Sequence, residues 1–319
     1  MNFEFSVLCL FYGENVCVAI VKSTKKACKN AAYYKDGEGK YLCGVHSKKD
    51  NRVKLRRNPD EEKNKLVELT RRMKIGKKRA KENKKKGLKG DIIITKLKMM
   101  KSPTYVEGYS MIFPNYRHQN RKDGFGCMRL SPKSLGPVVH NMPNLPIAKN
   151  LENFHQFAKF WKFELDEDGN VKEEHLNYRV EGYKSEIPMR RKYPKTEISK
   201  RNNKKMGQEF ALFYDKNGNE RKYTYLEARY FYCHFYERLV KKENDFKKLK
   251  KALENGFNLN LVGYDGYHVD KSLWECYNDV NRPFGHELVL YTLLTIEHPE
   301  DYPWNRFYRD YEELYSNVI

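Results

Sequence analysis

Three polar side chains in the segment LENFHQFAKF, residues 151–160, have a spacing that could support chemistry. Glu152, Gln156 and Lys159 are separated by four and three residues, so on a helix they share one face, opposite an aromatic face. A carboxylate on the same helix face as an ammonium group can activate water, while the ammonium group binds a phosphate or keeps the carboxylate ionised. The same spacing is typical of the solvated side of an amphipathic helix, so the pattern leaves both interpretations open.

Candidate metal ligands lie near the N-terminus: Cys17, Cys28, Cys43 and His46. The turn in C-G-V-H can point Cys43 and His46 at one ion, and thiolates with imidazole are the ligands of closed zinc sites. A module of about 50 residues has little core of its own, so a structural zinc would supply folding free energy. We therefore predict one structural zinc, although the ten residues between Cys17 and Cys28 exceed the usual spacing and a chance grouping is the alternative.

The segment LCGVHS, with Ala32 and Tyr34 before it, resembles small zinc modules in uncharacterised proteins of giant DNA viruses. The resemblance extends through LSPKSLGP, PFGHELVLYTLL and DYPWN. It implies a viral source and no particular mechanism.

A basic segment follows this module. Of the 62 lysines and arginines, 22 lie in residues 47–101 with only 7 acidic residues, so this stretch carries +15 of the net charge of +20. Pro59 favours a helix start and Gly87 a helix end. The local charge predicts contacts with the phosphates of DNA or RNA, and a solvated linker helix is the alternative. The candidate nucleic-acid contacts are Arg56, Arg57, Arg71, Arg72, Lys77, Lys78, Arg79, Lys84, Lys85 and Lys86.

The composition also restricts where the protein works. No apolar run approaches the roughly 18 residues of a transmembrane helix, and FSVLCLFY near the N-terminus has no lysine or arginine before it, as a signal peptide would. Seven cysteines is an odd number, and four of them stand singly among apolar neighbours, which favours reduced thiols. We therefore expect an intracellular protein that is not secreted and does not bind membranes.

Residues 91–319 have the pattern of a compact domain of helices and strands. Strands are predicted at DIIIT and NLNLVGYDG, and a hairpin is predicted over FALFYDKNGNERKYTY, where Asn-Gly separates two strand-like runs. Helices alternating with short apolar strands favour an α/β or α+β fold. The expected organisation is a zinc module over residues 1–50, a basic helical linker over residues 51–90 and this compact domain.

Three helices must present the candidate site residues. The first is capped by Asn150 and continues to Trp161, so that it carries Lys159. The second begins at Thr224, with Glu227 completing a capping box, and runs to residue 256. The third begins near Pro283.

The order of Glu152, Gln156, Lys159 and Phe160 resembles the first helix of the NADAR family, N-glycosidases acting on ADP-ribose-like or ribosylated pyrimidine compounds. In that family the motif runs roughly S/T-x-E-x-x-x-Q-x-x-K, followed by phenylalanine or alanine. The resemblance implies that this face belongs to a glycosidic site.

The C-terminal part of the chain is loosely similar to the end of NADAR chains, where a strand enters a W-G turn and a helix follows. Gly263 stands at the glycine of the turn, but Val262 replaces the tryptophan, and His286 with Glu287 replaces the usual Asn-Leu-Leu-Gly pattern. Because of these departures, the resemblance fixes neither the identity of the substrate nor the presence of activity.

The implied reaction suits the residue types. An N-glycosidic bond breaks through a cationic oxocarbenium-like state, which Glu152 or Asp265 can stabilise or serve by activating water, with Lys159 as the third catalytic candidate. The candidate substrate contacts are Gln156, Gly263, His286 and Glu287. A helix starting near His286 would favour an anionic, nucleotide-like ligand.

Two hypotheses follow. The first is a zinc-stabilised, nucleic-acid-associated protein whose NADAR-like domain binds or hydrolyses an N-glycosidic nucleotide or ADP-ribose-type compound. The second is a non-enzymatic DNA- or RNA-binding or assembly protein. Burial distinguishes them: a pocket that Glu152 and Lys159 share with Asp265 or His286 favours the enzyme.

Overall fold

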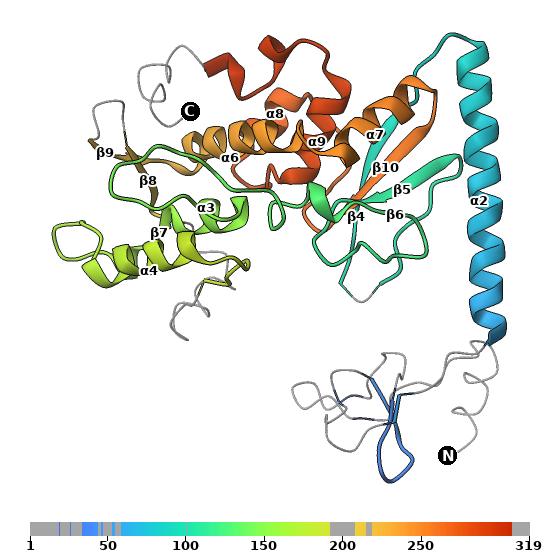
Figure 1. The fold of residues 1–319 in the computed structure, drawn as a ribbon, viewed down its shortest axis with the longest axis horizontal. Helices are drawn as coiled ribbons and strands as arrows, with labels where there is room; N and C mark the ends of the chain where they lie inside the picture. The colour runs from blue at the N-terminus through green and yellow to red at the C-terminus, as the bar shows by residue number, and fades with distance from the viewer. Residues whose placement is uncertain are drawn as a thin grey trace. The chain divides into compact units, whose positions relative to one another are not determined.

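The computed structural model describes residues 19, 26, 34–43, 46, 53–54, 59–99, 101–191, 208–214 and 219–307 (Figure 1). The chain divides into two compact units, residues 1–67 and residues 68–319. In the first unit the short strands β1 (Tyr34–Lys35), β2 (Tyr41–Leu42) and β3 (Val53–Lys54) form an antiparallel sheet in the order β2-β1-β3. None of the helices in the described part of the chain combines the length and the apolarity needed to cross a membrane.

The second unit is built on a parallel sheet with the strand order β4-β10-β5-β6. The strands are β4 (Ile92–Lys96), β10 (Asn258–Gly263), β5 (Tyr109–Phe113) and β6 (Phe125–Gly126). All six residues of β10 are buried, as expected for a strand that pairs on both sides and is covered on both faces. The strands predicted at DIIIT and NLNLVGYDG are therefore confirmed.

A smaller antiparallel sheet has the order β7-β8-β9. Its strands are β7 (Lys159–Phe160), β8 (Phe210–Tyr214) and β9 (Glu220–Tyr223). Strands β8 and β9 confirm the two arms of the predicted hairpin, whereas its Asn-Gly turn lies outside the described residues. With one parallel sheet, antiparallel sheets and several helices, the fold is a mixture of helix and strand, as predicted.

The α-helices in the described residues of the second unit, besides part of α2, are α3 (Leu151–Phe157), α4 (Glu173–Lys184), α6 (Tyr225–Val240), α7 (Asn244–Glu254), α8 (Leu273–Asn278) and α9 (His286–Thr295). Helix α6 joins the two sheets, because it packs against α9 and also against α3, β8 and β9 (Figure 1). Helices α9 and α7 pack on the parallel sheet. Aromatic side chains fill the junction: the Phe154 ring lies 4.8 Å from Phe235 of α6 and 5.7 Å from Phe213 of β8.

Three helix boundaries differ from those predicted. The helix expected over residues 224–256 is two helices: α6 ends with the buried Val240, and after a short turn α7 begins at Asn244 and buries Phe246 and Leu249. The helix expected to continue to Trp161 ends at Phe157, and the chain then enters β7. The last helix begins at residue 286 rather than near residue 283.

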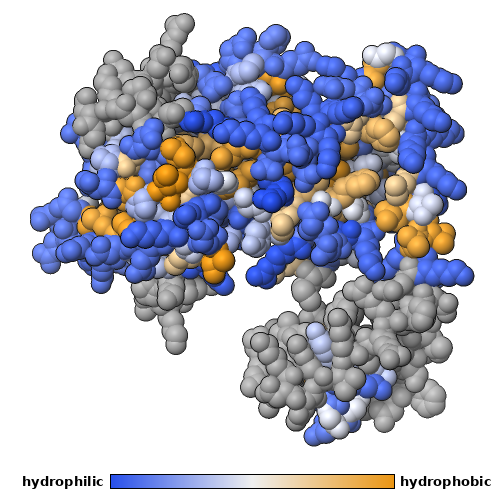
Figure 2. All heavy atoms as spheres, viewed as in Figure 1, coloured by the Kyte–Doolittle hydropathy of each residue, from blue (hydrophilic) through white to orange (hydrophobic). Residues whose placement is uncertain are grey.

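Helix α2 (Pro59–Lys85) confirms the helix predicted in the basic segment, and Gly87 follows it with a φ of +69°. Gly76 and Ala80 are buried, and the Asn83 amide donates to the Gly256 carbonyl at 2.8 Å. The second half of α2 is thus part of the unit formed by residues 68–319. Hydrophilic residues cover most of the face of this unit seen in Figure 2.

Candidate active site

A pocket of about 1210 Å³ lies at the carboxyl ends of the parallel strands. Its wall includes Met99 after β4, Asn115 after β5 and Tyr264 after β10. Ligands of open parallel sheets bind at this edge, where the loops that follow the strands converge. Residues of α3, α6 and α9 complete the wall.

The pocket brings together six of the seven residues predicted for catalysis and substrate binding. They are Glu152, Gln156, Lys159, Asp265, His286 and Glu287. Glu152, Gln156 and Lys159 are half-buried in the pocket wall rather than on open surface. Gly263, the seventh, ends β10 directly before the lining residue Tyr264.

Glu152 is held at the start of α3 by backbone contacts and a cap. The Asn150 side chain accepts from the Asn153 backbone N–H at 2.9 Å, as predicted for an N-cap. The backbone N–H of Glu152 donates to the Pro132 carbonyl at 3.0 Å, so the loop that supplies the lining residue Lys133 is tied to the same helix. These bonds hold the first turn of α3 in place, and with it the backbone of Glu152.

Lys159 reaches the pocket from a strand and not from the helix predicted to carry it. It begins β7, where it pairs with Ala211 of β8. The sequence pattern placed Lys159 one helical turn after Gln156. In the structure the next residue, Phe160, is fully buried and pairs with Phe210 in the small sheet, so residues 159 and 160 are extended. Strand pairing with a segment some 50 residues away thus decided its position.

Glu287 occupies the space that two glycines leave open. A Cβ on Gly263 would lie 1.8 Å from Glu287 Oε1, and a Cβ on Gly285 would lie 3.1 Å from Glu287 Oε2 and 3.9 Å from Asp265 Oδ2. Both carboxyl groups therefore border the same point beside Gly285. Gly263 matters to the site because it makes room for a neighbouring acid, a role different from the substrate contact predicted for it.

The Glu287 carboxyl group is fully buried, and neither oxygen has a hydrogen-bond partner among the described residues. A polar neighbour is His286, whose Nδ1 lies 3.2 Å from Glu287 Oε2. His286 Nε2 lies 3.0 Å from the Pro114 carbonyl, which can only accept, so Nε2 carries a hydrogen. The other ring nitrogen, Nδ1, is the one that faces the buried Glu287 carboxyl group.

This arrangement changes what the start of α9 can bind. The positive end of the helix dipole already has a carboxylate, Glu287, in its first turn. An anionic ligand therefore gains less there than the sequence suggested.

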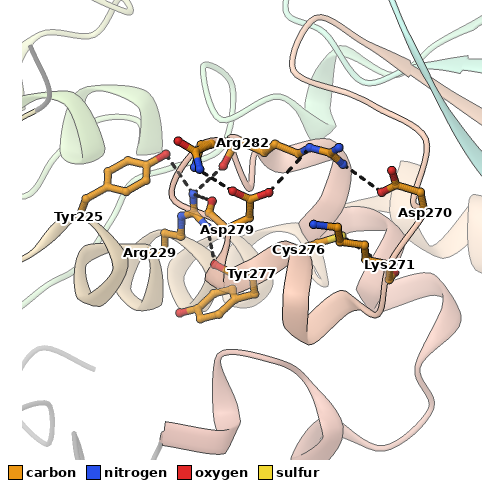
Figure 3. A network of polar contacts seen from close by, with 9 residues as sticks. Tyr225, Arg229, Asp270, Lys271, Cys276, Tyr277, Asp279 and Arg282 are labelled. Carbon is orange, nitrogen blue, oxygen red and sulfur yellow. Dashed lines mark hydrogen bonds and ion pairs between the residues drawn. The ribbon is translucent and has the colours of Figure 1, made fainter. Parts of the chain in front are cut away.

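The loop that leads to His286 is fixed by Arg229 of α6, as Figure 3 shows. The buried guanidinium group donates to the carbonyl oxygens of Tyr277, Asp279 and Arg282, the last at 2.6 Å, and to the Tyr225 hydroxyl at 3.2 Å. One side chain thus satisfies one carbonyl in the last turn of α8 (Leu273–Asn278) and two carbonyls of the loop that follows it. Sequence reasoning missed Arg229 because it sits in a run of aromatic residues that indicated only a helix core.

The charges around the pocket are mixed. Its carboxyl groups belong to Glu152, Asp265 and Glu287, and its lining cations, apart from Arg229, are Arg117, Lys133, Lys159 and Arg190. Burial, and then the charge of Lys159, lowers the pKa of His155 well below its usual value, so this ring is neutral at pH 7. A pocket with both signs of charge can hold an anionic ligand and also stabilise a cation that forms within it.

Two tyrosines of the pocket were not predicted. Tyr264 and Tyr225 have exposed rings that line the cavity. Tyr264 follows the buried strand β10, and Tyr225 is the first residue of α6. Exposure depends on the surrounding fold, so neither residue had a distinguishing pattern in the sequence.

The described part of the N-terminal unit contains two of the four predicted zinc ligands. Cys43 is buried, and its Sγ lies 3.4 Å from His46 Nδ1. Two ligands of one tetrahedral zinc, with bonds of about 2.3 and 2.0 Å, are about 3.5 Å apart, so this pair fits the geometry. Cys17 and Cys28 lie outside the described residues, and the described residues alone hold no group of three or more potential metal ligands.

The candidate nucleic-acid contacts on α2 differ in their surroundings. Arg71 and Arg72 both pair with Glu68, and Arg72 also stacks on the Tyr105 ring. Arg79 pairs with Glu82. The lysines at positions 77, 78, 84, 85 and 86 are exposed and form no ion pair with any residue whose place is described, while Arg56 and Arg57 lie outside the described residues.

No family model, curated protein or solved structure matches this chain.

Proposed function

We propose that the pocket binds an anionic nucleotide or ADP-ribose-type compound and hydrolyses its N-glycosidic bond. The observation that carries the proposal is the convergence of Glu152 and Lys159, from residues 151–160, with Asp265, more than 100 residues later in the chain, in one pocket at the carboxyl ends of a parallel sheet. Such a convergence of carboxylates and a cation in a concave site is typical of a catalytic centre.

In the proposed reaction water adds its hydroxyl group to the anomeric carbon while the carbon–nitrogen bond breaks, and the base leaves with a proton. Glu152, half-buried, or Asp265, exposed at the pocket, stabilises the cationic sugar or takes the proton from water. Lys159 and Arg190 bind the phosphate groups. Glu287 borders the pocket but is fully buried, so it acts on the site electrostatically and not by contact with the ligand.

The test compares wild-type protein with Glu152→Gln, which keeps the volume and removes the charge. The matched control is Glu181→Gln, an exposed glutamate of α4 that does not line the pocket. Each protein is incubated with ADP-ribosylated and ribosylated-base compounds, and the free base is measured by chromatography. We expect Glu152→Gln to lose about a hundredfold to a thousandfold in rate and the control to lose nothing. Equal turnover by all three proteins would remove Glu152 from the mechanism.

A second candidate function is nucleic-acid binding by α2, without a requirement for catalysis. The observation that favours it is the row of exposed lysines at positions 77, 78, 84, 85 and 86, none of them ion-paired within the described part of the chain. Such side chains contribute to affinity by releasing counterions from phosphates and give no choice of sequence.

This candidate is tested by changing Lys77, Lys78, Lys84 and Lys85 to glutamine, which avoids deleting the packed residues Ala80 and Asn83. Binding to duplex DNA is measured against salt concentration. We expect weaker binding and a salt slope that is smaller by about 0.9 for each phosphate that the variant no longer neutralises. A slope that does not change would assign binding to another surface.

A further inference from the structure

Exposed aromatic rings are concentrated in the pocket. Among the described residues, three phenylalanine, tyrosine or tryptophan side chains are more than a third exposed: Phe125 at 50%, Tyr264 at 41% and Tyr225 at 37%. Two of these three, Tyr264 and Tyr225, line the same cavity. Aromatic surface left uncovered in a cavity is available for a flat ligand group, since every aromatic ring offers a face for stacking.

The Tyr264 ring is fixed by contacts at its hydroxyl end. Its oxygen lies 3.3 Å from His118 Nε2, and the two rings are 5.6 Å apart. His118 in turn packs edge-on against Phe113, which is fully buried at the end of β5. Burial lowers the pKa of His118, so the imidazole is neutral. Its Nε2 can then either donate to the Tyr264 oxygen or accept from the Tyr264 hydroxyl, depending on the tautomer.

The Tyr225 ring is fixed in a similar way. Its hydroxyl accepts from Arg229 Nη2 at 3.2 Å, and the guanidinium group lies 4.7 Å from the ring centre. Arg229 is buried and bound to three backbone carbonyls of α8 and the loop after it, so it cannot move with the tyrosine (Figure 3). Because both rings are already ordered, a ligand that contacts them loses little conformational entropy on their account.

We propose that Tyr225 and Tyr264 are the contact surfaces for a planar heteroaromatic group of the ligand. The inference rests on the proposed function, in which that group is the base joined to ribose by the glycosidic bond. Asp265 follows Tyr264 directly in the pocket wall, so a base on Tyr264 has its sugar beside a carboxylate. Removing one aromatic side chain on which a base stacks weakens binding by about fivefold to 150-fold.

The experiment measures the dissociation constants of AMP and of ribose 5-phosphate, which lacks the base, by calorimetry. It uses wild-type protein, Tyr264→Leu, Tyr225→Leu and Tyr264→Phe, with Phe125→Leu as an exposed aromatic control outside the pocket. Thermal melting checks that each variant is folded.

We expect wild-type protein and Phe125→Leu to bind AMP more tightly than ribose 5-phosphate. Each leucine variant should lose about fivefold to 150-fold for AMP and nothing for ribose 5-phosphate, and Tyr264→Phe should keep most of the AMP affinity. Equal binding of the two compounds by wild-type protein, binding of neither, or equal losses for both in the leucine variants would overturn the inference.

The outcome is separate from that of the glycosidase assay. An AMP preference that disappears in Tyr264→Leu supports base contact even when no glycosidic bond is cleaved. Cleavage by wild-type protein, together with unchanged AMP affinity in both leucine variants, would keep the proposed function and refute the role of the tyrosines.

Discussion

The contact between Gly263 and Glu287 makes a sharp prediction about Gly263→Ala. The added Cβ would lie 1.8 Å from Glu287 Oε1 and 2.4 Å from its Cδ and Cγ, far inside van der Waals contact. Gly263 is held by its pairing with Lys96 of β4 and by the Leu97 N–H, which donates to its carbonyl at 2.8 Å, and Glu287 is fully buried, so neither residue can easily give way. We expect the free energy of unfolding to fall by about 3 kcal/mol, the upper end for overpacked cores. For a unit of this size the melting temperature falls by roughly 6–12 °C.

The assay is urea denaturation of a double-mutant cycle with Glu287→Ala. In that background the atoms that clash are gone, so Gly263→Ala should cost less than about 1 kcal/mol. Gly76→Ala is the control. Gly76 lies inside α2, and a Cβ there would meet only Ser110 Oγ of β5, at 3.7 Å. Because alanine favours a helix over glycine, we expect a stabilisation of about 0.5–1 kcal/mol. The same loss for Gly263→Ala with and without Glu287 would refute the reasoning.

Three other predictions concern stability. Arg229→Met leaves the carbonyls of the loop before His286 without their donor, so we expect a loss of at least about 2 kcal/mol and faster amide exchange over residues 277–285; unchanged exchange would contradict this. Burial lowers the pKa of His140 from its ordinary 6.5 to about 4. As pH falls from 6.5 to 4 only the unfolded chain takes up this proton, so stability falls by about 1.4 kcal/mol per pH unit, and His140→Gln should flatten the slope in urea titrations. We also propose a structural zinc at Cys17, Cys28, Cys43 and His46: elemental analysis should find about one zinc per chain, and an N-terminal unit that stays folded without metal would exclude it.

Local sequence was enough to predict many elements of the fold. Asn150 and Thr224 are N-caps as predicted, since capping depends on a side chain and a backbone N–H only three residues away. Strands β4 and β10 followed from short apolar runs with turn residues beside them. The motif resemblance, together with the order of elements, selected six residues that line one pocket, although no local rule required them to meet.

Tertiary structure alone decided the features that depend on distant neighbours. Lys159 became a strand residue because Phe160 pairs with Phe210 of β8. The helix expected to continue past Val240 ends there, and α7 starts anew at Asn244 and buries Phe246 and Leu249. The exposure of Tyr264 and the burial of Glu287 likewise depend on loops and helices that are remote in sequence. Caps and periodicity act over a few residues, whereas burial and strand pairing are set by whichever segment the folded chain brings alongside.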